Sequence, residues 1–273
     1  MSLDLINPFA GLSPLALGVM ALGLFFAALA RGYSGFGFSA VLVSSWSLVT
    51  DPARAIAVAL MLEVAASIVQ AVSVWKEIPW RRVAILLAGA LIGSPLGVYF
   101  LATLPLDVMR LVVSVFVLVS ASLMLLGWKL RKKASEWGTG AVGIASGVAN
   151  GAVGMGGLPV ALFLTAAGDS PARIRAAIVA YFFFLDIIGL TFLLRADLVL
   201  PSTALSAVIA FPVMMIGMFL GARHFLGATP ESFRRVTLFM LLLIAAIGLA
   251  KTFMVALYSD PSVSLERYFA GGY

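Results

Sequence analysis

Long apolar segments alternate with short polar connections along the whole chain. These segments lie at residues 15–49, 55–74, 83–104, 111–128, 138–167, 176–194, 200–222 and 236–257. A helix needs about 20 mostly apolar residues to cross a bilayer, and all but the first and fifth segments fit one crossing. Those two are too long for one straight helix. The pattern predicts an all-α integral membrane protein, a polytopic helical bundle.

The two long segments are each interrupted by a glycine-rich stretch. The first stretch reads Arg31-Gly-Tyr-Ser-Gly-Phe-Gly-Phe-Ser39, and the second reads Asn150-Gly-Ala-Val-Gly-Met-Gly-Gly-Leu-Pro159. Irregular backbone survives at membrane depth only where protein or a water-filled cavity surrounds it. Interrupted segments at matching positions of two halves are typical of transporter binding sites. We therefore expect glycine-broken or re-entrant helices at both places, either as hairpins or as double crossings.

The two halves of the chain resemble each other in order and spacing. A spacing of 119 residues pairs Asp51-Pro-Ala-Arg54 with Ser170-Pro-Ala-Arg173, and it also pairs the two glycine breaks. A polar linker at 128–137 separates a first transmembrane repeat, 1–127, from a second, 138–273. Further glycines match at a slightly longer spacing, Gly93 and Gly97 with Gly217 and Gly221. The preserved order favours two structural repeats over chance recurrence of glycine and proline.

The basic residues predict how the repeats are oriented. Lys76, Arg81 and Arg82 share one short loop, and the linker is also basic, so both should be cytoplasmic. The arginines of the second half reach the same side only if its broken segment enters and leaves on one face; they are Arg173, Arg175, Arg223, Arg234 and Arg235. The repeats would then be inverted, with both termini extracytoplasmic.

Composition narrows the class of protein. The chain is 62% hydrophobic and 11% charged, far from a soluble domain. It has no cysteine and one histidine, so we expect no metal site and no cofactor. The net charge of +6 is explained by the basic loops, and we expect no nucleic-acid partner. No nucleophile and base are arranged for catalysis, which favours a non-enzyme in the cell inner membrane, as a multi-pass protein.

The glycine breaks suit the binding of a small anion. A broken helix exposes N–H groups at the N-terminus of its second part, where the dipole is positive. Arg31 offers a planar donor fork to an oxyanion, although an arginine that snorkels from a helix end is the alternative. Its repeat partner Asn150 would contribute a neutral donor from the opposite side. The predicted substrate-binding residues are Arg31, Ser34, Gly35, Phe36, Gly37, Ser39, Asn150, Gly154, Met155, Gly156 and Gly157.

Two carboxylates interrupt apolar segments. Glu63 and Asp186 are candidate coupling residues, and the alternative is a structural carboxylate paired with an arginine or placed near a helix end. They are not repeat partners, because Phe182 stands 119 residues after Glu63. A negative cell interior drives an anion outward without a coupling ion, whereas uptake would need protons or sodium. Separately, Gly89, Gly93 and Gly97 predict a face for close helix packing.

The duplicated glycine motifs give the chain a resemblance to the TauE/SafE family of membrane transporters. The resemblance rests on Arg31-Gly-Tyr-Ser-Gly-Phe-Gly37 and Gly151-Ala-Val-Gly-Met-Gly-Gly-Leu-Pro159, and extends from about Leu15 to Leu257. The resemblance implies that the chain is a transporter. Members of the family look like exporters or facilitators of sulfite, sulfoacetate or related sulfonates.

The sequence thus predicts an exporter of a small anion that works by alternating access between two glycine-broken helices. Its partners would be the anionic substrate and the lipid bilayer. The oligomeric state is left open, with a homodimer as one option. The alternatives are anion uptake coupled to protons or sodium, and a membrane assembly factor that transports nothing.

Overall fold

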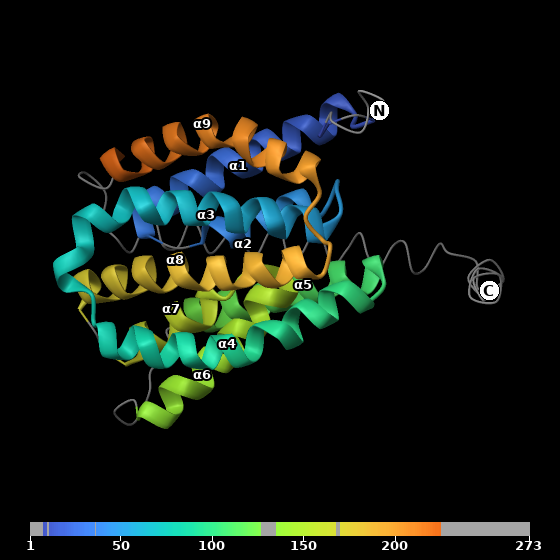
Figure 1. Cartoon of the computed structure of the whole chain (residues 1–273). Coiled ribbons are helices and arrows are strands. Elements are labelled where there is room, and N and C mark those ends of the chain that lie inside the picture. The colour runs from blue at the N-terminus through green and yellow to red at the C-terminus, as the bar shows by residue number, and fades with distance from the viewer. Residues whose placement is uncertain (1–7, 10, 36, 127–134, 168–169, 225–273) are drawn as a thin grey trace.

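The computed structural model describes residues 8–9, 11–35, 37–126, 135–167 and 170–224, and these are helical apart from short connections. Outside the described residues lie the eighth apolar segment (236–257), most of the predicted linker, Arg234 and Arg235. The helices are α1 (Pro14–Ser34), α2 (Phe38–Trp46), α3 (Pro52–Val74), the 3-10 helix η2 (Trp75–Glu77), α4 (Trp80–Thr103), α5 (Leu106–Leu125), α6 (Glu136–Val153), α7 (Gly157–Ala166), α8 (Pro171–Arg195) and α9 (Pro201–His224). Figure 1 shows them stacked side by side.

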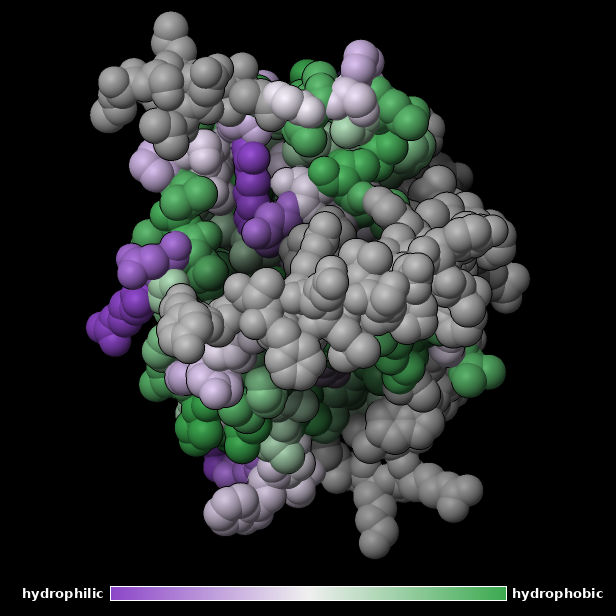
Figure 2. Space-filling model, turned by 90° about the vertical axis from the view of Figure 1, so that its right-hand side faces the viewer, coloured by the Kyte–Doolittle hydropathy of each residue, from purple (hydrophilic) through white to green (hydrophobic). Residues whose placement is uncertain are grey.

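The prediction of an all-α polytopic membrane protein is confirmed. Five of the described helices are long and apolar enough to cross a membrane: α1, α3, α4, α8 and α9. Their outward faces carry large apolar side chains, such as Ile92, Val208 and Phe219, each more than 60% exposed. Figure 2 shows hydrophilic residues gathered beside broad apolar surfaces at one end of the bundle. An apolar surface of this extent suits contact with lipid.

Polar side chains and prolines fix where several of these helices begin. Asp51 accepts a hydrogen bond from the N–H of Ala53 at 2.8 Å, and Pro52 follows it at the first position of α3. Ser13 and Ser170 cap α1 and α8 in the same way, again directly before a proline. A capping oxygen satisfies a free N–H, and proline lacks the N–H that would need one. Connections can therefore be short.

The glycine breaks separate a long helix from a short one in each half. Gly35 ends α1 with φ 78°, and Gly154 ends α6 with φ 67°. This left-handed conformation is readily adopted by glycine and strained for other residues. The short helices α2 and α7 begin three residues later, at Phe38 and Gly157, so the elements recur at the predicted spacing of 119.

After each broken segment, the chain is back at the end of the bundle from which that segment began. Arg54, in the first turn of α3, donates hydrogen bonds to the carbonyl of Pro8, before α1, and to Ser206 at the start of α9. At the other end, Arg173 and Glu136, from the starts of α8 and α6, line a cavity of about 450 Å³. The loop arginines Arg81 and Arg82 line it too, which groups residues that the charge pattern places on one side. Which end is cytoplasmic stays a prediction.

Helices α3 and α8 lie side by side in the middle of the bundle and run in opposite directions (Figure 1). Their pairing is visible in two contacts: Leu60 lies against Gly189, and Glu63 lies against Asp186. Residue numbers rise along one helix as they fall along the other, as antiparallel packing requires. This pair brings polar residues of both halves to one place.

Small residues allow the flanking helices to approach closely. The prediction for Gly89, Gly93 and Gly97 is confirmed, because a Cβ atom on any of them would collide with backbone of α6. Helices α1 and α9 also approach closely at a glycine of one helix and a backbone carbonyl of the other. Gly97 faces the carbonyl of Val148, and Gly221 faces the carbonyl of Leu29.

These two glycine contacts are related by the repeat spacings. Val148 follows Leu29 by 119 residues, and Gly221 follows Gly97 by 124 residues. Gly151 facing the carbonyl of Ser94 and Gly32 facing that of Met218 are related in the same way, which supports the repeat interpretation. The division at 128–137 and the inversion of the repeats across the membrane stay predictions; α6 begins at Glu136, inside the proposed linker.

Candidate functional site

Arg31 lies in the last turns of α1 and is completely buried. Its Nη1 atom is 3.2 Å from Oε2 of Glu63, and its Nη2 atom donates to Oγ of Ser67 at 2.8 Å. The guanidinium carbon lies 4.8 Å from the ring centroid of Phe182. Burial of an arginine is tolerable when its charge is paired. Two of its donor atoms, Nη1 and Nη2, are used, and Nε has no hydrogen-bond partner in the described structure. The side chain therefore points into the protein and does not snorkel to an interface.

The partners of Arg31 are spaced to share one face of α3. Glu63 and Ser67 are four residues apart, which places their side chains one turn apart on the same side of the helix. Glu63 is also at the middle of α3, a helix long enough to span the membrane. The ion pair is thus near the centre of the bundle.

Glu63 also holds the start of the short helix α2. Its Oε1 atom accepts a hydrogen bond from the N–H of Ser39 at 3.1 Å, in the first turn of that helix. A carboxylate is favoured there by the free N–H groups and by the positive end of the helix dipole. The sequence predicts that a bound anion occupies this position. In the structure, the side chain of Glu63 occupies it.

Asp186 connects this group with the second half of the chain. Its side chain is 2% exposed and lies close to those of Glu63 and Asn150. Its Oδ2 atom has no hydrogen-bond partner in the described structure. A buried polar atom without a partner is costly, so this oxygen is available for a proton, a water molecule or a ligand.

Asn150 organises the second break. Its Oδ1 atom accepts from the N–H of Gly156, and its Nδ2 atom donates to the carbonyl of Leu185, both at 3.4 Å. Nearby, the hydroxyl of Tyr181 donates to Oγ of Ser146 at 2.7 Å, and Ser146 donates to the carbonyl of Gly156. These bonds satisfy the irregular backbone before α7 inside the protein.

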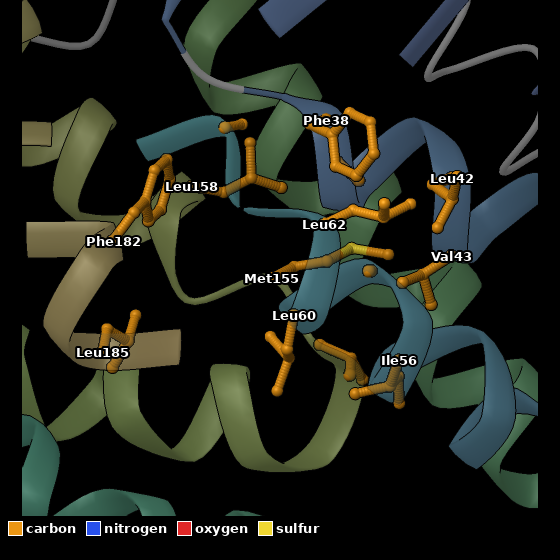
Figure 3. Packing of buried hydrophobic residues seen from close by; sticks show 14 of the residues in the cluster. Phe38, Leu42, Val43, Ile56, Leu60, Leu62, Met155, Leu158, Phe182 and Leu185 are labelled. Carbon is orange, nitrogen blue, oxygen red and sulfur yellow. The ribbon is translucent and has the colours of Figure 1, made fainter. Parts of the chain in front are cut away.

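Apolar side chains enclose the second break. Met155 is 1% exposed and lies among Leu62 and Val43, as Figure 3 shows. The ring of Phe182 covers Gly157 so closely that a Cβ atom there would overlap it. Phe182 therefore lies between the start of α7 and the guanidinium of Arg31.

The structure brings many of the predicted site residues together and leaves others apart. Arg31, Ser39, Glu63, Asp186 and Asn150 form one connected group, called here the central polar cluster. Gly35, Gly37, Gly154, Gly156 and Gly157 shape the two breaks around it, and Met155 lies in the apolar core. Phe36 and the side chain of Ser34 lie outside the described residues. Substrate binding by any of these residues stays a prediction.

Two members of the cluster's surroundings were missed by sequence reasoning. Ser67 and Phe182 both contact Arg31. The repeat spacing of 119 residues could have identified both residues, because it pairs Ser67 with Asp186 and Phe182 with Glu63, and Asp186 and Glu63 were already candidates. Arg31 contacts Ser67 in one half, and Asn150 contacts Asp186 in the other, so equivalent positions carry different chemistry.

Arg175 is a third missed residue. Its side chain lies beside Gly35, where a Cβ atom would be 3.3 Å from Cγ of Arg175, and it is close enough to Arg31 for the two charges to repel. Its buried Nε atom has no hydrogen-bond partner in the described structure. The equivalent residue of the first half is Ile56, which packs on Gly154. Equivalent positions of the two repeats thus carry an apolar side chain in the first half and a cation in the second.

Among residues 8–224 as far as they are described, no group of three or more His, Asp or Glu side chains is placed to hold a metal ion. The polar atoms of the cluster instead form one ion pair, one carboxyl contact and donors suited to oxygen atoms. This chemistry suits a small oxyanion or a proton.

Comparison with known proteins gives one family match. The family model for the sulfite exporter TauE/SafE matches residues 20–248, which include both glycine breaks and the central polar cluster. No curated protein and no solved structure matches the chain. Members of this family are transporters and not enzymes. The chain belongs to the TauE/SafE family, and it is a multi-pass membrane protein of the sulfite and organosulfonate exporter type.

Proposed function

We propose that this protein exports a small oxyanion, such as sulfite, sulfoacetate or another organosulfonate, by alternating access around Arg31. The observation that carries the proposal is the position of Arg31. It is buried at the centre of the bundle, where residues from both glycine-broken segments meet. Buried ionisable groups in membrane proteins commonly mark the path of a substrate or an ion.

The chemistry of the site fits an oxyanion. The guanidinium presents donors in a planar fork that matches two oxygens of a sulfite or sulfonate group. The N–H of Ser39, at the start of α2, adds a backbone donor on the same side, as shown by its bond to Glu63. An oxyanion bound here would take over the contacts that the Glu63 carboxylate makes in the structure.

Arg175 supports a route to this site. It is partly exposed, and it lies against Gly35 at the first break. A cation at that place would attract an anion and pass it toward Arg31. We assign Arg175 to the entry path and Arg31 to the binding position.

Transport can be tested with purified protein in liposomes. Vesicles loaded with sulfite or sulfoacetate should release the anion only when they contain the protein, and taurine and acetate would define selectivity. Arg31→Lys keeps the charge but loses the fork, so we expect flux to fall at least about tenfold, equivalent to about 1.4 kcal/mol. Arg195→Ala, at an exposed end of α8, is the matched control and should transport normally.

The outcomes separate the proposal from its rivals. Equal flux in Arg31→Lys and wild type would remove Arg31 from the binding position. A folded wild-type protein that moves no anion, and acts only with a partner protein, would favour the membrane assembly factor.

A further inference from the structure

We infer that anion binding at Arg31 is coupled to the uptake of one proton by the carboxyl pair Glu63–Asp186. In this view the carboxylate of Glu63 is an internal counter-anion that the substrate replaces. The inference rests on the proposed function, because it takes Arg31 as the binding position. It adds a coupling ion to that function and assigns the groups that carry it.

Two carboxyl groups meet at one buried cation. Glu63 and Asp186 are 1% and 2% exposed and face each other between α3 and α8, about one turn from the contact of Leu60 with Gly189. A proton shared by two such carboxyl groups lets one donate a hydrogen bond to the other. The pair then carries one negative charge, which balances the positive charge of Arg31. Like charges this close cannot both stay ionised without a large penalty.

The carboxylate of Glu63 and the incoming anion need the same donors. Glu63 uses Nη1 of Arg31 at 3.2 Å and the N–H of Ser39 at 3.1 Å. An oxyanion that binds to these donors must displace the carboxylate. A displaced carboxylate would be buried and without a counter-charge, which is strongly unfavourable.

Protonation solves this conflict with balanced charge. An organosulfonate with a single charge brings one negative charge to Arg31, and a proton from solution converts the Glu63–Asp186 pair from one shared proton to two. No covalent bond to carbon changes, and the net charge of the cluster is the same before and after. The Oδ2 atom of Asp186, which has no partner in the described structure, leaves room for the second proton on the pair.

The other groups that face the pair are neutral or partly exposed to solvent. From α2 the pair meets a backbone N–H, from α6 the neutral amide of Asn150, and from α8 the hydroxyl of Tyr181. Arg175 on α8 is a further cation, close enough to Arg31 for the two charges to repel. It is partly exposed, so solvent reaches it, whereas the pair is enclosed.

Calorimetry on the wild-type protein tests the inference without any substitution. Methanesulfonate is the probe, because it carries one negative charge and stays fully ionised at pH 7. Binding heats are measured in Bis-Tris and in Tris, which contain no oxyanion that could compete and which differ in ionisation enthalpy. We expect uptake of about one proton for each anion bound. Binding with no proton uptake would overturn the inference and leave the proposed function intact. No binding of methanesulfonate or of sulfoacetate in either buffer would overturn the proposed function itself.

Variants then locate the proton. Glu63→Gln should still bind methanesulfonate, with proton uptake reduced to less than half and with a flatter pH dependence of affinity. Glu77→Gln, an exposed carboxylate after α3, is the matched control and should behave as wild type. Unchanged proton uptake in a folded Glu63→Gln protein would overturn the assignment to Glu63. In liposomes, a methanesulfonate gradient should move protons in the same direction as the anion, as a pH-sensitive dye would report.

Discussion

Arg31 and Glu63 form an ion pair in which neither side chain is more than 1% exposed, and the carboxylate also binds the first turn of α2. The pair therefore joins three elements: α1, α2 and α3. Through Asp186 it extends to α8 and to the second half of the chain. The structural ion pair and the proposed substrate site share the same atoms in this protein.

Removing one partner of this pair should cost more stability than removing both. Arg31→Met leaves the Glu63 carboxylate buried without its cation, and we expect a loss of about 3–5 kcal/mol. The double variant Arg31→Met with Glu63→Met replaces both charges by apolar groups and should recover a large part of that loss. Thermal unfolding in detergent would measure both. A double variant no more stable than Arg31→Met would contradict this account of the pair.

The contact between α4 and α6 offers a test of close helix packing. A Cβ atom at Gly143 would collide with the carbonyl of Leu86, whereas one at Gly140, three residues earlier in the same helix, would meet Ile85 at an ordinary 3.9 Å. Gly143→Ala should destabilise the protein by about 1–3 kcal/mol. Gly140→Ala should be neutral or slightly stabilising, since alanine favours helix. Similar unfolding temperatures for the two variants would argue against this close contact.

The repeat relationship predicts equal effects at equivalent glycines. Gly97 meets the carbonyl of Val148, and Gly221 meets that of Leu29. Gly97→Ala and Gly221→Ala should therefore lower the unfolding temperature by similar amounts. Gly18→Ala is the control, because a Cβ atom there would have nothing within 4 Å. A large loss at only one of the two positions would show that the halves do not pack alike.

The sequence predicted the fold better than it predicted the site. Apolar length and proline-glycine spacing identify helices and repeats, because membrane crossing and close packing impose simple patterns on single residues. The partner of Arg31 could not be found in this way. Glu63 and Arg31 are 32 residues apart, and their meeting depends on how α1 packs on α3. A comparison of repeat partners even pointed away from the Glu63–Asp186 contact, since antiparallel packing joins residues that the spacing does not pair.

Arg175 shows the same limit and gives the last prediction. Its counterpart Ile56 packs on Gly154, so Arg175→Ile places beside Gly35 a side chain that the fold already accommodates at the equivalent position. We expect this variant to fold as well as wild type and to lose the attraction for the entering anion. The KM for sulfite efflux should rise about tenfold, equivalent to about 1.4 kcal/mol, with kcat nearly unchanged. Arg173→Ala, an exposed arginine two residues earlier, should leave KM as it is. Equal KM values in Arg175→Ile and wild type would exclude Arg175 from the entry path, whereas a fall in kcat alone would place it at a later step.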